Sequence, residues 1–169
     1  ENLPLVICVA LGTNMGGHSG LSPLTGVLEV YSNISNRAVV IAAGNEANQR
    51  HHYLGAVENE GDNDEVEVRV SENVKGFCAE LWSDALDLLA VSIISPSGEQ
   101  TYRFPIRSEE TERYAFVLEG TTVSVDYKVF VERLNAELIF FRFENPTAGI
   151  WKIVVEAVGV ESGQFHLWL

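Results

Sequence analysis

Short strand-like segments, separated by regularly spaced turn signals, make up the second half of the chain. The segment 65–70, Glu-Val-Glu-Val-Arg-Val, alternates polar and apolar residues with the period of two that a half-buried strand requires. Turn sequences such as Ser-Pro-Ser-Gly at 95–98 and Asn-Pro-Thr-Ala-Gly at 145–149 separate the later segments. Seven or eight short strands at this spacing predict an antiparallel β-sandwich or jelly roll that needs no helix. The later strands are expected at 77–82, 88–94, 113–118, 121–131, 137–143, 150–158 and 164–169.

The first fifty residues follow a different pattern, of strand, loop, helix and strand. Leu5–Leu11 and Ala38–Ala43 are continuous apolar runs, which are typical of strands covered on both faces in a parallel sheet. Between them, Ser22 is a suitable helix N-cap, with Pro23 at the first helical position. Apolar residues then recur at helical spacing and form one stripe. The stripe consists of Leu24, Val27, Leu28, Tyr31 and Ile34.

Together the two patterns predict a mixed fold. A partial α/β piece, one βαβ unit of a parallel sheet, is followed by an all-β antiparallel sandwich. The acidic segment 59–64, Asn-Glu-Gly-Asp-Asn-Asp, is the natural junction between them. We therefore predict two domains, residues 1–58 and residues 59–169.

Charge and hydropathy exclude several classes of function. The chain has 24 acidic and 11 basic residues, and a net charge of -13 repels phosphate backbones, so nucleic acid is not expected as a partner. No apolar run approaches the ~20 residues that a membrane span requires. Cys8 and Cys78 both lie among apolar residues, and we expect two reduced, buried thiols.

Metal and cofactor motifs are absent from the sequence. It contains neither a Cys-x-x-Cys nor a His-Glu-x-x-His spacing, so no metal and no cofactor are predicted. The carboxylates between 58 and 65 could bind calcium in the parent protein, but they lack the EF-hand pattern. A solvated acidic linker is our interpretation of that segment, and a solvated pair is our interpretation of His51-His52.

The feature with the clearest chemistry is the end of the second apolar strand, Ala42-Ala43-Gly44-Asn45-Glu46. A side-chain amide at the end of a strand can donate a hydrogen bond to the oxyanion that forms during acyl transfer. Taken alone, Gly-Asn at a strand end is more often a simple turn. However, Val9-Ala10-Leu11-Gly12, a loop, a helix and this motif follow one another in an order that resembles the subtilisin-like serine peptidases, the subtilases, over Pro4–Glu46.

The resemblance implies a subtilisin-like parallel sheet in which Asn45 is the oxyanion-hole asparagine. It also implies that Leu11 and Gly12 line the cleft for a peptide or protein substrate. The family's His-Gly-Thr, Gly-Thr-Ser and Asp-Thr-Gly motifs, which carry the catalytic triad, do not occur in this chain. The chain alone is therefore expected to be inactive and to need the remainder of the subtilase catalytic domain. His18, beside Ser19, is interpreted as a surface loop residue rather than a catalytic base.

The β half has a resemblance of its own. The Ser-Pro-x-Gly turn at 95–98 and the Asn-Pro-x-x-Gly-x-Trp sequence at 145–151 look like the jelly-roll accessory domains of subtilases. Because this half follows Asn45 directly, the arrangement is similar to the clostridial germination-protease type, in which a jelly roll interrupts the catalytic domain. A bacterial protein, secreted or associated with spores, would fit that resemblance. We expect Trp151 to anchor the core, and Trp82 and Trp168 to be core residues rather than carbohydrate platforms.

Two other functions remain as alternatives. The sandwich could be a binding module for a glycan or a protein, with the first fifty residues as an attachment. The parent could also be a pseudoprotease, which keeps the fold and binds a partner without catalysis. Nucleotide binding has little support, because the loop around Gly16-Gly17 is not a Gly-x-Gly-x-x-Gly fingerprint.

Overall fold

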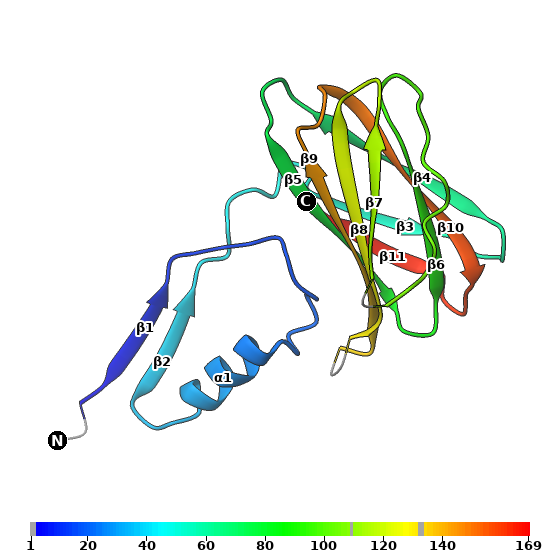
Figure 1. Ribbon diagram of the computed structural model, residues 1–169. Helices are drawn as coiled ribbons and strands as arrows, with labels where there is room; N and C mark the ends of the chain where they lie inside the picture. Colours follow the sequence, from blue (N-terminus) through cyan, green and yellow to red (C-terminus); the bar gives the residue numbers. More distant parts are fainter. Residues whose placement is uncertain (1–2, 109, 132–133) are drawn as a thin grey trace. The chain divides into compact units, whose positions relative to one another are not determined.

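A computed structural model describes residues 3–108, 110–131 and 134–169. The chain forms two compact units, one ending at His51 and one running from His52 to Leu169 (Figure 1). The predicted domain limits, 1–58 and 59–169, stay a prediction. In the described residues, no helix is long and apolar enough to cross a membrane.

The first unit contains two parallel strands and one helix. Strand β1 (Leu5–Val9) pairs in parallel with β2 (Arg37–Ile41), and helix α1 (Pro23–Ser32) lies between them in sequence. The Ser22 hydroxyl accepts a hydrogen bond from the Thr25 backbone N–H at 3.1 Å, and Asn33 forms the C-cap. The predicted helix and its N-cap are therefore confirmed.

The predicted fold class is wrong. Among the described residues the chain is mostly β, with 51% strand and 6% helix, and its sheets are antiparallel except for the two strands β1 and β2. This pair is not the subtilisin-like parallel sheet that we expected. A continuous apolar pattern indicates that a strand is suited to burial, but not which chain covers it. Within residues 3–108, 110–131 and 134–169 no further strand joins the pair, and Val6 and Val40 are 61% and 54% exposed.

The second unit is a sandwich of two antiparallel sheets. The larger sheet has six strands, in the order β3 (His52–Ala56), β11 (Gln164–Trp168), β5 (Gly76–Asp84), β9 (Ala136–Glu144), β8 (Thr121–Val131) and β7 (Thr111–Phe116). The smaller sheet has three, in the order β4 (Asn63–Val70), β10 (Gly149–Gly159) and β6 (Leu88–Ile94). The predicted β-sandwich is thus confirmed, whereas β3 was not predicted.

Alternate side chains of both sheets point inward and form one hydrophobic core. Trp151 is fully buried and packs edge-on against Phe116 and Phe143, with ring centroids 5.0 and 5.5 Å away. Its indole N–H donates to the Thr147 carbonyl at 2.9 Å, so the buried polar atom is satisfied. The prediction for Trp151 is confirmed.

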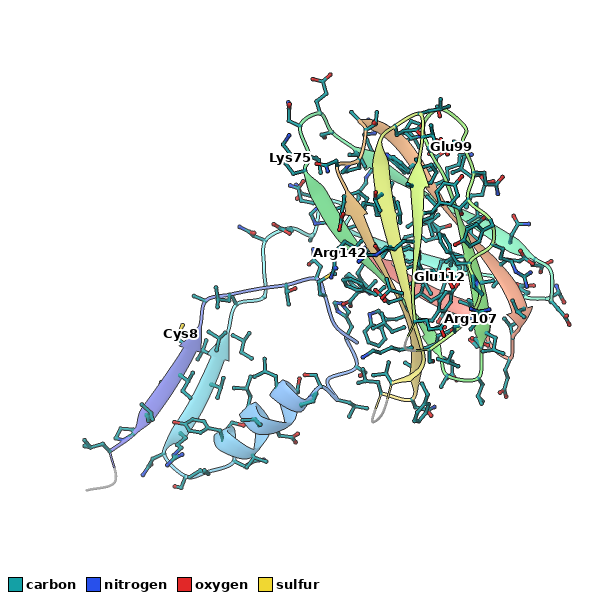
Figure 2. All side chains as sticks on the ribbon, viewed as in Figure 1. Cys8, Lys75, Glu99, Arg107, Glu112 and Arg142 are labelled. Atoms are coloured by element: carbon teal, nitrogen blue, oxygen red, sulfur yellow. The ribbon has the colours of Figure 1, made fainter. Side chains whose placement is uncertain are left out.

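Four other side chains differ from their predicted burial. Trp82 and Trp168 are only half-buried and lie outside the core cluster. Their neighbours in sequence, Leu81 and Leu167, point into the core, so both tryptophans face outward from the six-stranded sheet. Cys8 is exposed on β1 (Figure 2) and Cys78 is half-buried, although both thiols are free as expected. An apolar sequence neighbourhood did not reveal which face of each strand the residue occupies.

The sandwich begins and ends on neighbouring strands. Strand β3, its first, pairs antiparallel with β11, its last, and His52 lies opposite Trp168 (Figure 1). The two rings stack with centroids 3.9 Å apart. The points where the chain enters and leaves the sandwich are therefore adjacent.

Candidate functional site

The backbone turns sharply just before Asn45. Strand β2 ends at Ile41, and the Ala42 N–H still donates to the Val9 carbonyl at 3.1 Å. Gly44 then adopts a φ of 79°, a left-handed conformation that glycine takes without a side-chain clash. The turn carries the chain away from the strand and leaves Asn45 exposed, with its amide accessible.

Leu11 and Gly12 lie at the same edge of the two-stranded sheet as Asn45. Because β1 and β2 are parallel, their carboxyl ends meet at one edge, and Leu11-Gly12 and Gly44-Asn45 follow those ends (Figure 1). Leu11 is 78% exposed, and nothing lies within 4 Å of the position a Gly12 Cβ would occupy. Three residues selected from sequence therefore share one open edge, the side of an open α/β arrangement at which ligands bind.

A contact missed by sequence reasoning connects the two loops at this edge. The His51 Nδ1 atom lies 3.2 Å from the Asn14 side-chain nitrogen and 3.4 Å from a Glu46 carboxylate oxygen. Neutral His51 can accept from the Asn14 amide, whereas the protonated ring would donate to Glu46. Glu46 follows Asn45 in the chain, so the contact with the protonated ring would tether the segment that carries the amide. Asn14 and His51 are 37 residues apart, which no local motif could reveal.

The predicted surface position of His18 is confirmed, and His51 and His52 are half-buried and exposed, which agrees with the predicted solvated pair. His18 is exposed, and its Nε2 lies 2.9 Å from the Asn14 carbonyl oxygen. His51 faces Asn14 and Glu46, whereas His52 Nε2 lies 2.9 Å from His166 Nδ1. The adjacent histidines thus have separate partners.

A buried carboxylate pair lies inside the sandwich. Asp87 accepts hydrogen bonds from three successive backbone N–H groups of the turn before β11, those of 161, 162 and 163, at 2.7, 3.0 and 3.0 Å. Glu137 accepts from the Ser83 hydroxyl at 3.2 Å and from the Leu89 N–H at 3.3 Å. Burial, reinforced by the charge of Asp87, raises the pKa of Glu137 to about 7, against the effect of its two hydrogen bonds.

This pair has a structural explanation. Asp87 satisfies three backbone N–H groups of the turn, and Glu137 Oε2 satisfies Ser83 and Leu89, whereas Glu137 Oε1 is buried without a hydrogen-bond partner among the described residues. Neither side chain is exposed, so no substrate can reach them in the folded sandwich. The edge that carries Asn45 is therefore the better candidate for chemistry.

The comparisons with known proteins point to a protease. No known protein-family profile and no curated protein matches the chain. Among the solved structures that match is the CspB protease of Clostridium perfringens, with a TM-score of 0.84 and 26% sequence identity. The match covers 98% of this chain and 35% of the CspB chain, so this chain spans about a third of that protein's length. Both units therefore have the fold of part of a protease.

Proposed function

We propose that this chain is part of a subtilisin-like serine endopeptidase that cleaves peptide bonds through an acyl-enzyme. Asn45 donates to the oxyanion, and Leu11 and Gly12 line the substrate cleft. The observation that carries the proposal is the similarity to a protease across both units, combined with the position of these three residues at one sheet edge.

The chemistry requires a donor that is already oriented when charge develops. Attack on the scissile carbonyl places negative charge on its oxygen, and a fixed amide N–H stabilises that charge more than it stabilises the neutral carbonyl. The left-handed turn at Gly44 directs Asn45, and the single contact of Glu46 with protonated His51 would tether the next residue. Gly12 has open space beside its backbone, so an extended substrate can approach it closely.

The remainder of a catalytic domain is the partner that we propose for the first unit. None of its described residues is buried, and large apolar side chains are exposed on both strands and the helix, among them Val6, Val27 and Val40. Such an apolar surface is unusual for a complete domain. The triad residues would come from that remainder, so the chain alone would be inactive.

The adjacent ends of the sandwich support its role as an insertion. A domain can interrupt a host without separating the host's two flanking segments when its own ends lie close together. His52 and Trp168 are direct cross-strand partners. We therefore propose that the sandwich interrupts the catalytic domain between Asn45 and the nucleophile.

The test uses the full-length parent protein and a fluorophosphonate probe, which labels only an activated serine. We expect a label on a serine outside this chain. Asn45→Ala should lower kcat by about 10²–10³ while the probe still reacts, because an oxyanion donor is lost but the nucleophile is kept. Asn48→Ala, an exposed asparagine of the same segment, is the matched control. Equal activities of the two variants would contradict the role of Asn45.

One observation favours a binding function as a second candidate. The half-buried Trp82 and Trp168 share the outer face of the six-stranded sheet with Phe140 and Arg142, whose guanidinium lies 5.7 Å from the Phe140 ring centroid. Partly exposed aromatics of this kind can stack on a ligand. A parent that is folded but not labelled, and a Trp82→Ala variant that loses binding to a glycan array, would favour this candidate over the protease.

A further inference from the structure

Two histidines face each other across the first and last strands of the sandwich. His52 is the first residue of β3 and His166 lies within β11, the neighbouring strand. His52 Nε2 and His166 Nδ1 are 2.9 Å apart, and the ring planes differ by 13°. The ring centroids are 5.1 Å apart, so the two imidazoles meet edge to edge with one nitrogen of each directed at the other.

This separation is close to the spacing of two imidazole ligands on one metal ion. Zinc binds histidine nitrogens at about 2.0–2.1 Å with tetrahedral angles, which separates two such nitrogens by about 3.3 Å. To accept an ion of this kind, the two nitrogens would need to move apart by about 0.4 Å and each ring to turn within its plane by about 35°, so that both lone pairs meet the ion. Imidazole suits Zn²⁺, Cu²⁺ and Ni²⁺, and Cu²⁺ binds most strongly of the divalent first-row ions.

Trp168 restrains the ring of His52, and the exposure of His52 lets an ion approach from solvent. Trp168 stacks on the His52 ring with centroids 3.9 Å apart and an interplanar angle of 20°, which limits rotation of that ring. His52 is exposed and His166 is half-buried, so an ion can enter from solvent. No group of three or more His, Cys, Asp or Glu side chains suited to a metal is found in the described parts of the chain. Water would therefore complete the coordination.

We propose that His52 and His166 form a two-histidine site for a late first-row divalent metal ion, such as Zn²⁺ or Cu²⁺. Before binding, one neutral ring donates its N–H to the bare nitrogen of the other. On binding, that proton moves to the second nitrogen of the donating ring. Each neutral imidazole then offers one lone pair to the ion, and no net proton is released. The ion joins residues 114 apart in sequence, on the two strands at which the sandwich begins and ends. The bound ion cross-links β3 and β11 and so limits the separation of the two ends of the sandwich.

The experiment is a Cu²⁺ titration of the 169-residue chain, followed by tryptophan fluorescence. Because Trp168 contacts the ring of His52, bound Cu²⁺ should quench its emission with a saturable curve. His52→Gln and His166→Gln should each weaken binding at least tenfold, whereas His51→Gln, the neighbouring histidine with other partners, should bind as the wild type does. Zn²⁺ should raise the Tm of the wild type and of His51→Gln, but not of the two site variants.

Three results would overturn the proposal. These are the absence of saturable quenching in the wild type, unchanged quenching in His52→Gln, and an equal loss in His51→Gln. Circular dichroism of each variant checks that the strands remain formed. Electron paramagnetic resonance of the Cu²⁺ complex should show two nitrogen ligands in the wild type and fewer in His166→Gln, and an unchanged spectrum would also refute the site.

Discussion

Glu137→Gln should stabilise the sandwich at neutral and alkaline pH. Burial raises the pKa of Glu137 from its ordinary value of 4.5 to about 7, and the charge of Asp87 adds to the effect. One pKa unit corresponds to about 1.4 kcal/mol, so keeping the ionised carboxylate inside the fold costs about 3 kcal/mol relative to the unfolded chain. Glutamine keeps an oxygen that can accept from Ser83 and Leu89 and carries no charge, but its amide nitrogen would take the position of Oε1, which has no hydrogen-bond partner among the described residues, and this offsets part of the gain. We expect a gain of about 1–3 kcal/mol at pH 8.

The sign of the pH dependence follows from the same shift. Below pH 4.5 the carboxyl of Glu137 is protonated in both states and carries no penalty. Between 4.5 and about 7 the folded state holds a proton that the unfolded chain has released, so this group's contribution to the free energy of unfolding falls as the pH rises. Above about pH 7 the loss is complete. The benefit of glutamine should therefore grow from near zero at pH 4 to its full value at pH 8.

Urea unfolding followed by tryptophan fluorescence measures this change in the sandwich alone. All three tryptophans, Trp82, Trp151 and Trp168, belong to the second unit. The control is Glu144→Gln, which removes an exposed carboxylate from the same strand. If the difference between wild type and Glu137→Gln were the same at pH 5 and pH 8, or if the control reproduced it, the reasoning from burial would be refuted.

Two further substitutions test the packing. Gly163→Ala should destabilise the chain by about 2 kcal/mol or more, because its φ is 67° and an added Cβ would lie 1.8 Å from the Val57 carbonyl oxygen; a thermal melt with an unchanged Tm would contradict this. Trp151→Ala should cost about 3–5 kcal/mol by opening a cavity beside Phe116 and Phe143, whereas Trp168→Ala should cost much less; equal urea midpoints for the two variants would contradict the assignment of Trp151 as the core anchor.

Most strands of the sandwich could be predicted, because the alternation of polar and apolar residues and the turn sequences that define them lie within short stretches of the chain. The strands β6 and β8 have the predicted limits, since alternation and flanking turns define both ends. Strand β3 was missed because His52–Ala56 is short and Gly55 interrupts its pattern. Gly55 is required by packing, since a Cβ there would lie 2.2 Å from the Phe165 ring, a residue 110 positions later. A contact between residues so far apart in the chain cannot be predicted from the sequence around Gly55.

Burial was harder to predict than strand position. The apolar runs around β1 and β2 predicted strands correctly but not the extent of their sheet, because an apolar run indicates that a strand is suited to burial and does not specify how many strands pair with it. For the candidate site, Gly44 after an apolar run was enough to predict that Asn45 lies at a strand end. The contact of His51 with Asn14 and Glu46 was not, because it depends on how two loops meet.

The candidate site lies on the part of the chain that contributes nothing to the core. Every member of the core cluster falls between Val57 and Leu167, and no described residue before His52 is buried. The sandwich therefore carries its own stability, and its first and last strands meet at His52 and Trp168. A folding unit with a complete core and adjacent ends can be placed within a host with little effect on the host's fold. The edge around Asn45, in contrast, lies outside this core, so formation of the sandwich and formation of the site should be separable.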